Sequence, residues 1–197
     1  MPMGFPELNL SPLFALMAEY YLIQYEGNYM ILQHNPSHRT IYADFIKLNG
    51  PFAYFITLTF QRLQTIETCT QQINYLIYLL NNKICGRNNN AEFLQGFCFF
   101  EKHKTSANNP LHSHIIIKDD SKLDLESKAS FADHFWTMIN KVRAVKSNCV
   151  TDKKAFNPKC CDIRRAHDQD GLIKYVTKIF EKPIDYNYFR PIGKNGI

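Results

Sequence analysis

His112 and His114 alternate along the segment Leu-His-Ser-His-Ile-Ile-Ile, which begins at residue 111. Side chains two residues apart on a β-strand point to the same face, so the two imidazoles can bind one divalent metal. If the preceding hairpin turns near residue 107 or 108, Glu101 lies opposite His112 and adds a carboxylate ligand. His103 shares the face of Glu101 and is an alternative or additional ligand. Two partly exposed histidines without a ligand role remain the competing interpretation.

Tyr175 and Lys178 lie three residues apart in a second segment with chemical potential, residues 171–182. The apolar residues of this segment recur at helical spacing and form one stripe: Leu172, Ile173, Val176, Ile179 and Phe180. This spacing places Tyr175 beside Lys178 on the flank of the helix. A phenol with a pKa of about 10 is a poor nucleophile at neutral pH, and a nearby ammonium or metal would activate it. The competing interpretation is a tyrosine that only packs at the edge of the helix.

The elements that position these residues follow from hydrophobic periodicity and turn residues. We expect strands over residues 51–60, 93–101, 111–118 and 160–165. We expect helices over residues 66–84 and 130–145, and a last helix from Asp168 or Asp170 to about Lys182. The order β-α-β-β-α-β predicts an α+β fold, the ferredoxin-like or split βαβ arrangement. Its antiparallel sheet would carry helices mainly on one face and leave the other face for a site.

Residues 1–50 are expected to form an N-terminal extension that packs on the same domain as residues 51–197. Residues 11–24 indicate a helix, with Ser11 as N-cap and Pro12 in the first turn. A turn near residue 27 and a short apolar stretch then suggest a small hairpin. Two roles are open for these residues: they brace the sheet, or they help to bind DNA.

Three motifs in this order resemble those of the HUH endonucleases, in particular the single-tyrosine rolling-circle replication initiators (Rep proteins). Residues 55–60, Phe-Ile-Thr-Leu-Thr-Phe, are similar to the first family motif. Glu101 with His112-Ser113-His114 resembles the metal-binding motif, and Tyr175-Val176-Thr177-Lys178 resembles the nucleophile motif. Ser113 departs from the family, which usually has an apolar residue there, and this affects the buried face of the strand more than the metal ligands.

The resemblance implies a metal-dependent nickase for single-stranded DNA or an origin hairpin. Glu101, His112 and His114 would bind Mg²⁺ or Mn²⁺ against the scissile phosphate. Tyr175 would attack that phosphate and form a 5′-phosphotyrosine link, while Lys178 would stabilise the developing charge. The sequence has no phosphate-binding Gly-x-x-x-x-Gly-Lys-Ser/Thr loop, so replication would require a helicase from the host or from another domain.

Positive charge is concentrated near the C-terminus. Residues 1–140 contain 10 Lys and Arg against 12 Asp and Glu, whereas residues 141–197 contain 13 against 6, so the net charges are −2 and +7. This asymmetry suggests a polyanionic partner, and a solvated basic face remains the competing interpretation. The residues expected to contact the DNA backbone are Lys153, Lys154, Arg164, Arg165, Lys174 and Lys182.

Three other functions fit parts of the pattern. A single-tyrosine transposase of the same superfamily would use identical chemistry, and Lys178 in the nucleophile helix favours the initiator over it. A non-enzymatic nucleic-acid-binding module would use an aromatic platform, for which Phe97, Phe99 and Phe100 are candidates. A zinc hydrolase would activate water and form no link to tyrosine.

Cysteine usage and hydropathy bear on the compartment. The six cysteines show no C-x-x-C pair, which argues against a disulfide framework. A zinc site of Cys149, Cys160, Cys161 and His167 is conceivable. No uncharged apolar run of about 18 residues occurs, and the start lacks signal-peptide features, so no membrane association is expected. We therefore expect a cytoplasmic protein, or a nuclear one if the genetic element belongs to a eukaryote.

Overall fold

The computed structural model describes residues 37–61, 64–86, 93–102, 111–120, 123, 130–146, 149–181 and 188–193. The helix expected over residues 11–24 and the hairpin expected after it lie outside these residues. The chain divides after Ser37, and all the elements named below belong to one compact unit, His38–Ile197.

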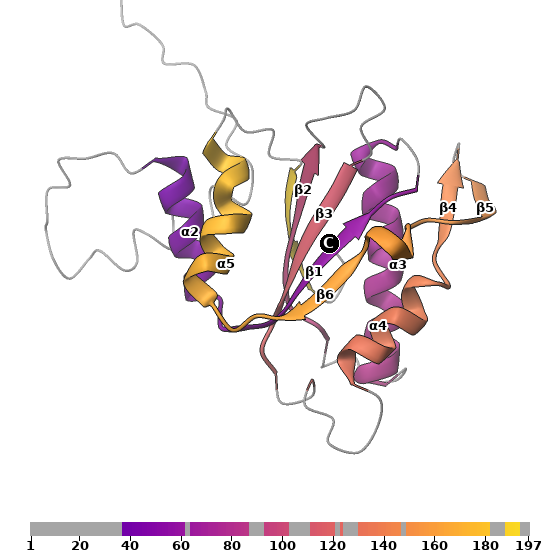
Figure 1. The fold of residues 1–197 in the computed structure, drawn as a ribbon, viewed down its shortest axis with the longest axis horizontal. Helices are drawn as coiled ribbons and strands as arrows, with labels where there is room; N and C mark the ends of the chain where they lie inside the picture. The colour runs from indigo at the N-terminus through magenta and orange to yellow at the C-terminus, as the bar shows by residue number, and fades with distance from the viewer. Residues whose placement is uncertain are drawn as a thin grey trace, which may run out of the picture. The chain divides into compact units, whose positions relative to one another are not determined.

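Five strands among the described residues form one antiparallel sheet (Figure 1). In spatial order they are β6 (Asp162–Arg165), β1 (Phe52–Thr59), β3 (Leu111–Lys118), β2 (Gly96–Lys102) and β7 (Phe189–Ile192). Aromatic and β-branched residues dominate β1, and β3 contains three consecutive isoleucines, as suits strands that are paired on both sides. The predicted α+β fold with an antiparallel sheet is confirmed.

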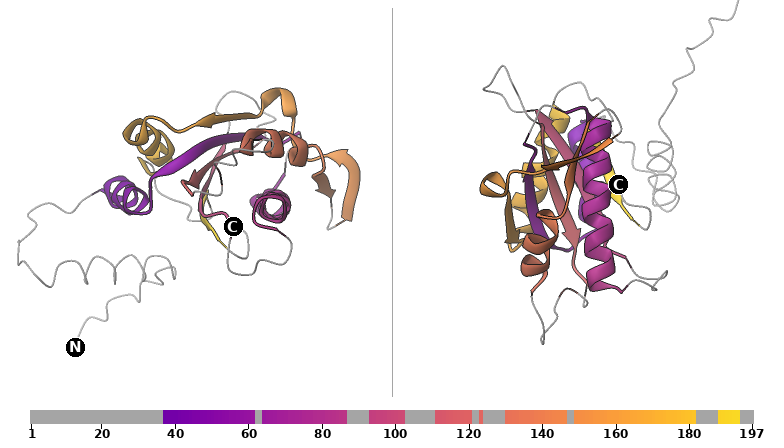
Figure 2. Two further views of the ribbon diagram at one scale, coloured as in Figure 1. Left: turned by 90° about the horizontal axis from the view of Figure 1, so that it is seen from below. Right: turned by 90° about the vertical axis from the view of Figure 1, so that its right-hand side faces the viewer.

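Two helices, α3 (Ile66–Ile84) and α4 (Phe131–Ile139), cover one face of the sheet (Figure 2). The side chain of Thr65 caps α3, and α4 begins with a capping box in which Ser130 and Asp133 bond each other's backbone N–H. The main core lies between these helices and the sheet; its members include Ile56, Leu58, Ile73, Leu76, Phe100, Ile115 and Phe135.

The other face of the sheet is covered by α2 (His38–Leu48) and α5 (Gln169–Val176), and α5 continues as the 3-10 helix η3 (Thr177–Glu181) (Figure 2). Tyr42 of α2 stacks on Phe180 with 4.0 Å between ring centroids. Phe180 in turn meets Phe99 of β2 edge-on, with 6.4 Å between ring centroids. We expected helices mainly on one face, and α2 adds a helix to the opposite face that the sequence analysis did not predict.

The C-terminal half differs from expectation at two places. The helix predicted over residues 130–145 was too long, because α4 ends at Ile139 with Asn140 as its C-cap. The following residues form a separate hairpin of β4 (Arg143–Lys146) and β5 (Cys149–Lys154). Val142 is buried although it lies beyond the helix, so the apolar spacing continued past the helical backbone. The edge strand β7 was also not predicted.

Candidate active site

Glu101, His112 and His114 lie on the face of the sheet that α5 covers. Glu101 of β2 is paired with His112 of β3, and Phe99 is paired with His114. Because cross-strand partners and alternate residues share a face, the three candidate ligands point to the same side. The cross-strand register predicted from the sequence is therefore confirmed.

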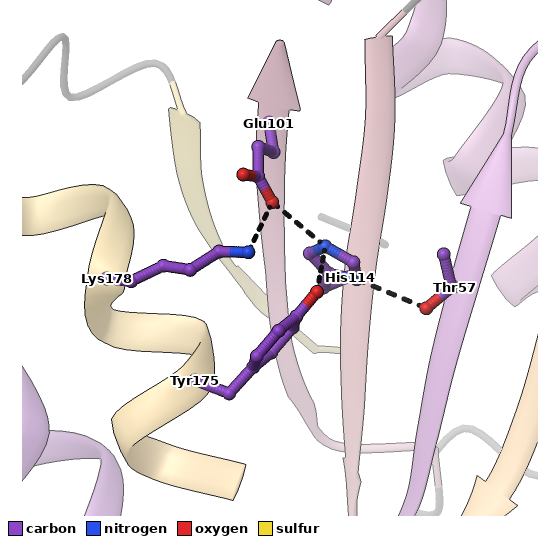
Figure 3. Close-up of polar contacts among 5 residues, drawn as sticks. All are labelled: Thr57, Glu101, His114, Tyr175 and Lys178. Carbon is purple, nitrogen blue, oxygen red and sulfur yellow. Dashed lines mark hydrogen bonds and ion pairs between the residues drawn. The ribbon is translucent and has the colours of Figure 1, made fainter. Parts of the chain in front are cut away.

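His114 is the most constrained of the three side chains, with 4% of its surface exposed. Its ring stacks on Phe55 with 5.4 Å between centroids. Its Nδ1 lies 3.2 Å from the hydroxyl of Thr57, and its Nε2 lies 3.2 Å from Oε2 of Glu101 (Figure 3). Burial, assisted by the charges of Lys178 and His112, outweighs the attraction of Glu101 and lowers the pKa of His114 to about 4. The imidazole is therefore neutral at pH 7, which is the form that binds metals.

The helix α5 places the nucleophile candidate over the sheet. Asp168 caps its first turn by accepting a hydrogen bond from the backbone N–H of Gly171, and Ile173 and Val176 are buried beneath it. Tyr175 keeps 43% of its surface exposed, while its hydroxyl lies 3.5 Å from Nε2 of His114. The apolar stripe of the segment thus packs inward and leaves Tyr175 at the boundary with solvent, as its flanking position predicted.

Lys178, in η3, lies beside Tyr175 and contacts the sheet. Its ammonium nitrogen is 4.0 Å from the centroid of the Tyr175 ring and 3.0 Å from Oε2 of Glu101 (Figure 3). Burial raises the pKa of Glu101, but the hydrogen bonds and charges of Lys178 and His114 outweigh it, so that this pKa is lowered. Burial also lowers the pKa of Lys178, and contacts with Glu101 and Tyr175 reverse that effect and raise it. Both groups are therefore charged at neutral pH.

The three candidate metal ligands share one face of the sheet. Among the described residues, no three His, Cys, Asp or Glu side chains form a group that could hold a metal ion as they stand. The rings of His112 and His114 have centroids 5.8 Å apart, and the carboxylate of Glu101 contacts Lys178 and His114. The ionised carboxylate is a ligand type that suits Mg²⁺ and Mn²⁺, whereas imidazoles are more typical ligands of transition metals such as Zn²⁺. A bound cation would replace Lys178 as the positive partner of Glu101.

The residues expected to contact DNA divide into separate regions. Arg164 is paired with Phe55, which contacts Tyr175, so Arg164 lies on the site face; Asp162 forms an ion pair with it. Arg165 lies on the opposite face, where its guanidinium carbon is 4.7 Å from the centroid of the Tyr54 ring.

The other candidates for DNA contact lie away from this edge of the sheet. Lys153 and Lys154 are exposed on the β4–β5 hairpin, well removed from α5 (Figure 1). Lys174 is exposed on α5. Lys182 and the alternative ligand His103 lie outside the described residues. The structure therefore brings together Glu101, His114, Tyr175 and Lys178, with Arg164 on the same face.

Two residues of the site, Thr57 and Phe55, were not predicted from the sequence. Thr57 bonds to His114, and Phe55 packs against both His114 and Tyr175. Both residues belong to the first of the three motifs, and alternation along β1 places them on the site face. That motif was the available signal, but it does not specify which side chain of β3 each residue meets.

Two alternative sites from the sequence analysis do not form. Phe97, Phe99 and Phe100 are all buried, so they provide no exposed platform for bases. The four residues of the possible zinc site do not make a metal-binding group. One of them, Cys161, is buried with its thiol against the backbone of Thr59.

Comparison with known proteins adds no family or fold assignment to this geometry. Comparisons with family models, curated protein sequences and solved structures give no match for this chain.

None of the helices in the described part of the chain has the length and apolar character needed to cross a membrane.

Proposed function

We propose that this protein is a metal-dependent endonuclease and strand transferase that nicks single-stranded DNA with Tyr175. The observation that carries the proposal is the convergence of the nucleophile segment on the two strands of the ligand segment. The hydroxyl of Tyr175 lies 3.5 Å from Nε2 of His114, and Lys178 lies 3.0 Å from Glu101. Packing at a helix edge alone does not require the hydroxyl of Tyr175 to face a buried imidazole.

The residues have distinct roles in the proposed reaction. The phenolic oxygen of Tyr175 attacks the scissile phosphorus, a new P–O bond forms, and the bond to the 3′-oxygen of the preceding nucleotide breaks. The products are a 5′-phosphotyrosine and a free 3′-OH, and a later 3′-OH can reverse the step and join strands. Lys178 stabilises the negative charge that develops on the phosphate. A divalent metal bound by Glu101, His112 and His114 would act as a Lewis acid on the phosphate oxygens.

The biological role we propose is initiation of rolling-circle replication of a plasmid, phage or virus. Tyr175 and Lys178 lie one helical turn apart, the spacing that resembles the Rep nucleophile motif. A helicase from the host or from another domain would unwind the duplex, because this sequence has no nucleotide-binding loop of the kind used by such motors. A transposase would share the chemistry and differ in the DNA that it joins.

The test is a search for a covalent protein–DNA complex. The full chain is incubated with a library of 5′-labelled and 3′-labelled single-stranded oligonucleotides, including hairpins, with Mn²⁺ or with a chelator. We expect a metal-dependent band that carries the 3′ label and survives denaturation, because the protein stays on the 5′-phosphate. Tyr175→Phe should abolish this band, since it removes the attacking oxygen and keeps the ring.

Tyr78→Phe is the matched control, because Tyr78 is 58% exposed on α3, which packs on the opposite face of the sheet. This variant should form the complex at the wild-type rate. A band that persists in Tyr175→Phe would assign the nucleophile elsewhere. Metal-dependent cleavage with no covalent band would favour a hydrolase, and binding without cleavage would favour a non-enzymatic module.

A further inference from the structure

Thr57 is the polar partner of His114 on the side of the ring that faces away from Glu101. The two residues are paired across β1 and β3, and their side chains share the site face. The hydroxyl oxygen of Thr57 lies 3.2 Å from Nδ1 of His114, while Nε2 of the same ring lies 3.2 Å from Glu101. Figure 3 shows these contacts at opposite edges of the imidazole.

The aromatic neighbours of the ring restrain its plane but do not determine which nitrogen faces which polar partner. Phe55 stacks on the imidazole with an interplanar angle of 23°, and Tyr175 meets it edge-on at 75°. Aromatic packing of this kind distinguishes poorly between an imidazole and the same imidazole turned over by 180°, which exchanges nitrogen and carbon positions. Hydrogen bonds at the two nitrogens do distinguish them, because a turned ring would present carbon to both Thr57 and Glu101. If Glu101 bound a metal, the Thr57 contact would remain to hold the orientation.

We propose that Thr57 is a positioning residue that orients His114 so that Nε2 faces Glu101 and Tyr175. This inference rests on the proposed metal-dependent function, in which Nε2 is a ligand atom. A hydroxyl suits the task because it both donates and accepts. When Nε2 carries the proton and donates to Glu101, the hydroxyl donates to Nδ1. When Nε2 presents its lone pair to a metal, Nδ1 carries the proton and donates a hydrogen bond to the hydroxyl oxygen.

The experiment compares three variants of the full chain without DNA. Thr57→Val keeps the branched shape and removes the hydroxyl, whereas Thr57→Ser keeps the hydroxyl. Thr151→Val is the matched control, because Thr151 is a half-buried strand threonine on β5 whose hydroxyl donates to the carbonyl of Ala144. Calorimetric titration with Mn²⁺ should show about tenfold weaker binding for Thr57→Val. Thr57→Ser and Thr151→Val should bind within about threefold of the wild type, a difference small against that tenfold loss.

A second readout needs no metal and no DNA. In ¹⁵N-labelled protein, the ring nitrogens of His114 give long-range ¹H–¹⁵N correlations that report which nitrogen is protonated and whether Nδ1 accepts a hydrogen bond. The Nδ1 resonance should shift in Thr57→Val and return towards its wild-type position in Thr57→Ser. Unfolding temperatures of all variants identify any general loss of structure.

Three results would overturn the inference: wild-type Mn²⁺ affinity in Thr57→Val, equal losses in the valine and serine variants, or no Mn²⁺ binding by the wild type. The first would show that orientation does not depend on the hydroxyl, and the second would indicate a purely steric role. Because these measurements involve no DNA cleavage, they separate the two proposals. Absence of a Tyr175 adduct together with a Thr57 effect on Mn²⁺ binding would reject the nickase and retain the positioning role.

Discussion

At the scale of single residues, the site is a short chain of polar contacts built on a buried histidine. His114 contacts Thr57 on one side and Glu101 and Tyr175 on the other, and Glu101 continues the chain to Lys178. Each link joins two different elements, and the links to Thr57, Tyr175 and Lys178 join elements that are distant in sequence. The neutral state of His114 follows from this burial, and it has a measurable consequence for stability.

We predict that the free energy of unfolding falls as the pH is lowered from about 6.5 to about 4. The folded state keeps His114 neutral down to a pKa of about 4, whereas the unfolded chain takes up the proton near the ordinary value of 6.5. The unfolded state therefore binds more protons in this window, and stability that is fully present above it is lost as the pH falls. The lowered pKa of Glu101 acts in the same direction.

Urea unfolding at pH 7 and pH 4.5 would measure this loss, which we expect to be on the order of 2 kcal/mol. His114→Gln should show a smaller change across the same interval, because it removes the titrating ring. A wild-type stability that does not change over this range would mean that His114 titrates normally in the folded protein.

The sequence analysis identified the four residues that meet at the site, but not all of their contacts. Strand alternation and the cross-strand register predicted that Glu101 and the two histidines share a face. The ion pair of Lys178 with Glu101 could not be predicted, since it depends on how α5 lies over the sheet. The side-chain contact of Glu101 with His114, diagonal to its paired residue His112, likewise depends on rotamers that spacing does not specify.

At the scale of elements, alternation along β6 separates two adjacent arginines. Arg164 is paired with Phe55 on the site face, and Arg165 is paired with Tyr54 on the face covered by α3 and α4. The sequence analysis gave both the same role because basic composition carries no information about which face a residue occupies. Only the pairing with β1 assigns them to different faces.

We predict that Arg164→Ala weakens single-stranded DNA binding about five- to tenfold and reduces the salt dependence by about 0.7 in log–log slope, the effect of one lost phosphate contact. The free energy of unfolding of this variant should change little, because the side chain of Arg164 is 75% exposed. Arg165→Ala should show the reverse: near-normal binding and a lower unfolding temperature, since it loses the contact with Tyr54. Fluorescence anisotropy at several salt concentrations measures the affinity for single-stranded DNA and its salt dependence. Equal losses of binding in both variants would contradict the assignment of faces.

Other elements show where periodicity is sufficient and where it is not. The boundaries predicted for the helix over residues 66–84 coincide with α3, because its apolar stripe packs on the sheet along its whole length. The same reasoning predicted a helix longer than α4, because Val142 remains in the core after α4 has ended and just before β4 begins. The short strand β7 has four residues and depends on pairing with β2, which no local pattern reveals.

At the scale of the compact unit, the nucleophile segment is braced by an element from the other end of this unit. The side chain of Arg39 donates to the backbone carbonyl of Lys174 at 2.9 Å, and Lys47 forms an ion pair with Asp170. Tyr42 is buried, stacks on Phe180 and meets Phe189 edge-on. The position of Tyr175 therefore depends on α2 as well as on its own helix.

We predict that Tyr42→Ala lowers the free energy of unfolding by about 3 kcal/mol, as expected for removal of a fully buried aromatic ring. It should also slow formation of the covalent complex at temperatures where the protein remains folded, because α5 loses its support. Tyr78→Ala, at an exposed position, should change stability by less than about 0.5 kcal/mol. Thermal unfolding and single-turnover adduct formation measure the two effects. A Tyr42→Ala variant with wild-type stability would contradict the packing of α2 on η3.

The most direct measurement of the central claim is the site of covalent attachment. Wild-type protein is reacted in Mn²⁺ with an oligonucleotide that it cleaves. The product is digested with nuclease and protease, and its peptides are analysed by mass spectrometry. We predict one modified peptide, containing residues 175–178, with a nucleotide 5′-phosphate on the oxygen of Tyr175. Attachment to another residue, or a complete set of unmodified peptides from protein that has cleaved its DNA, would contradict the account.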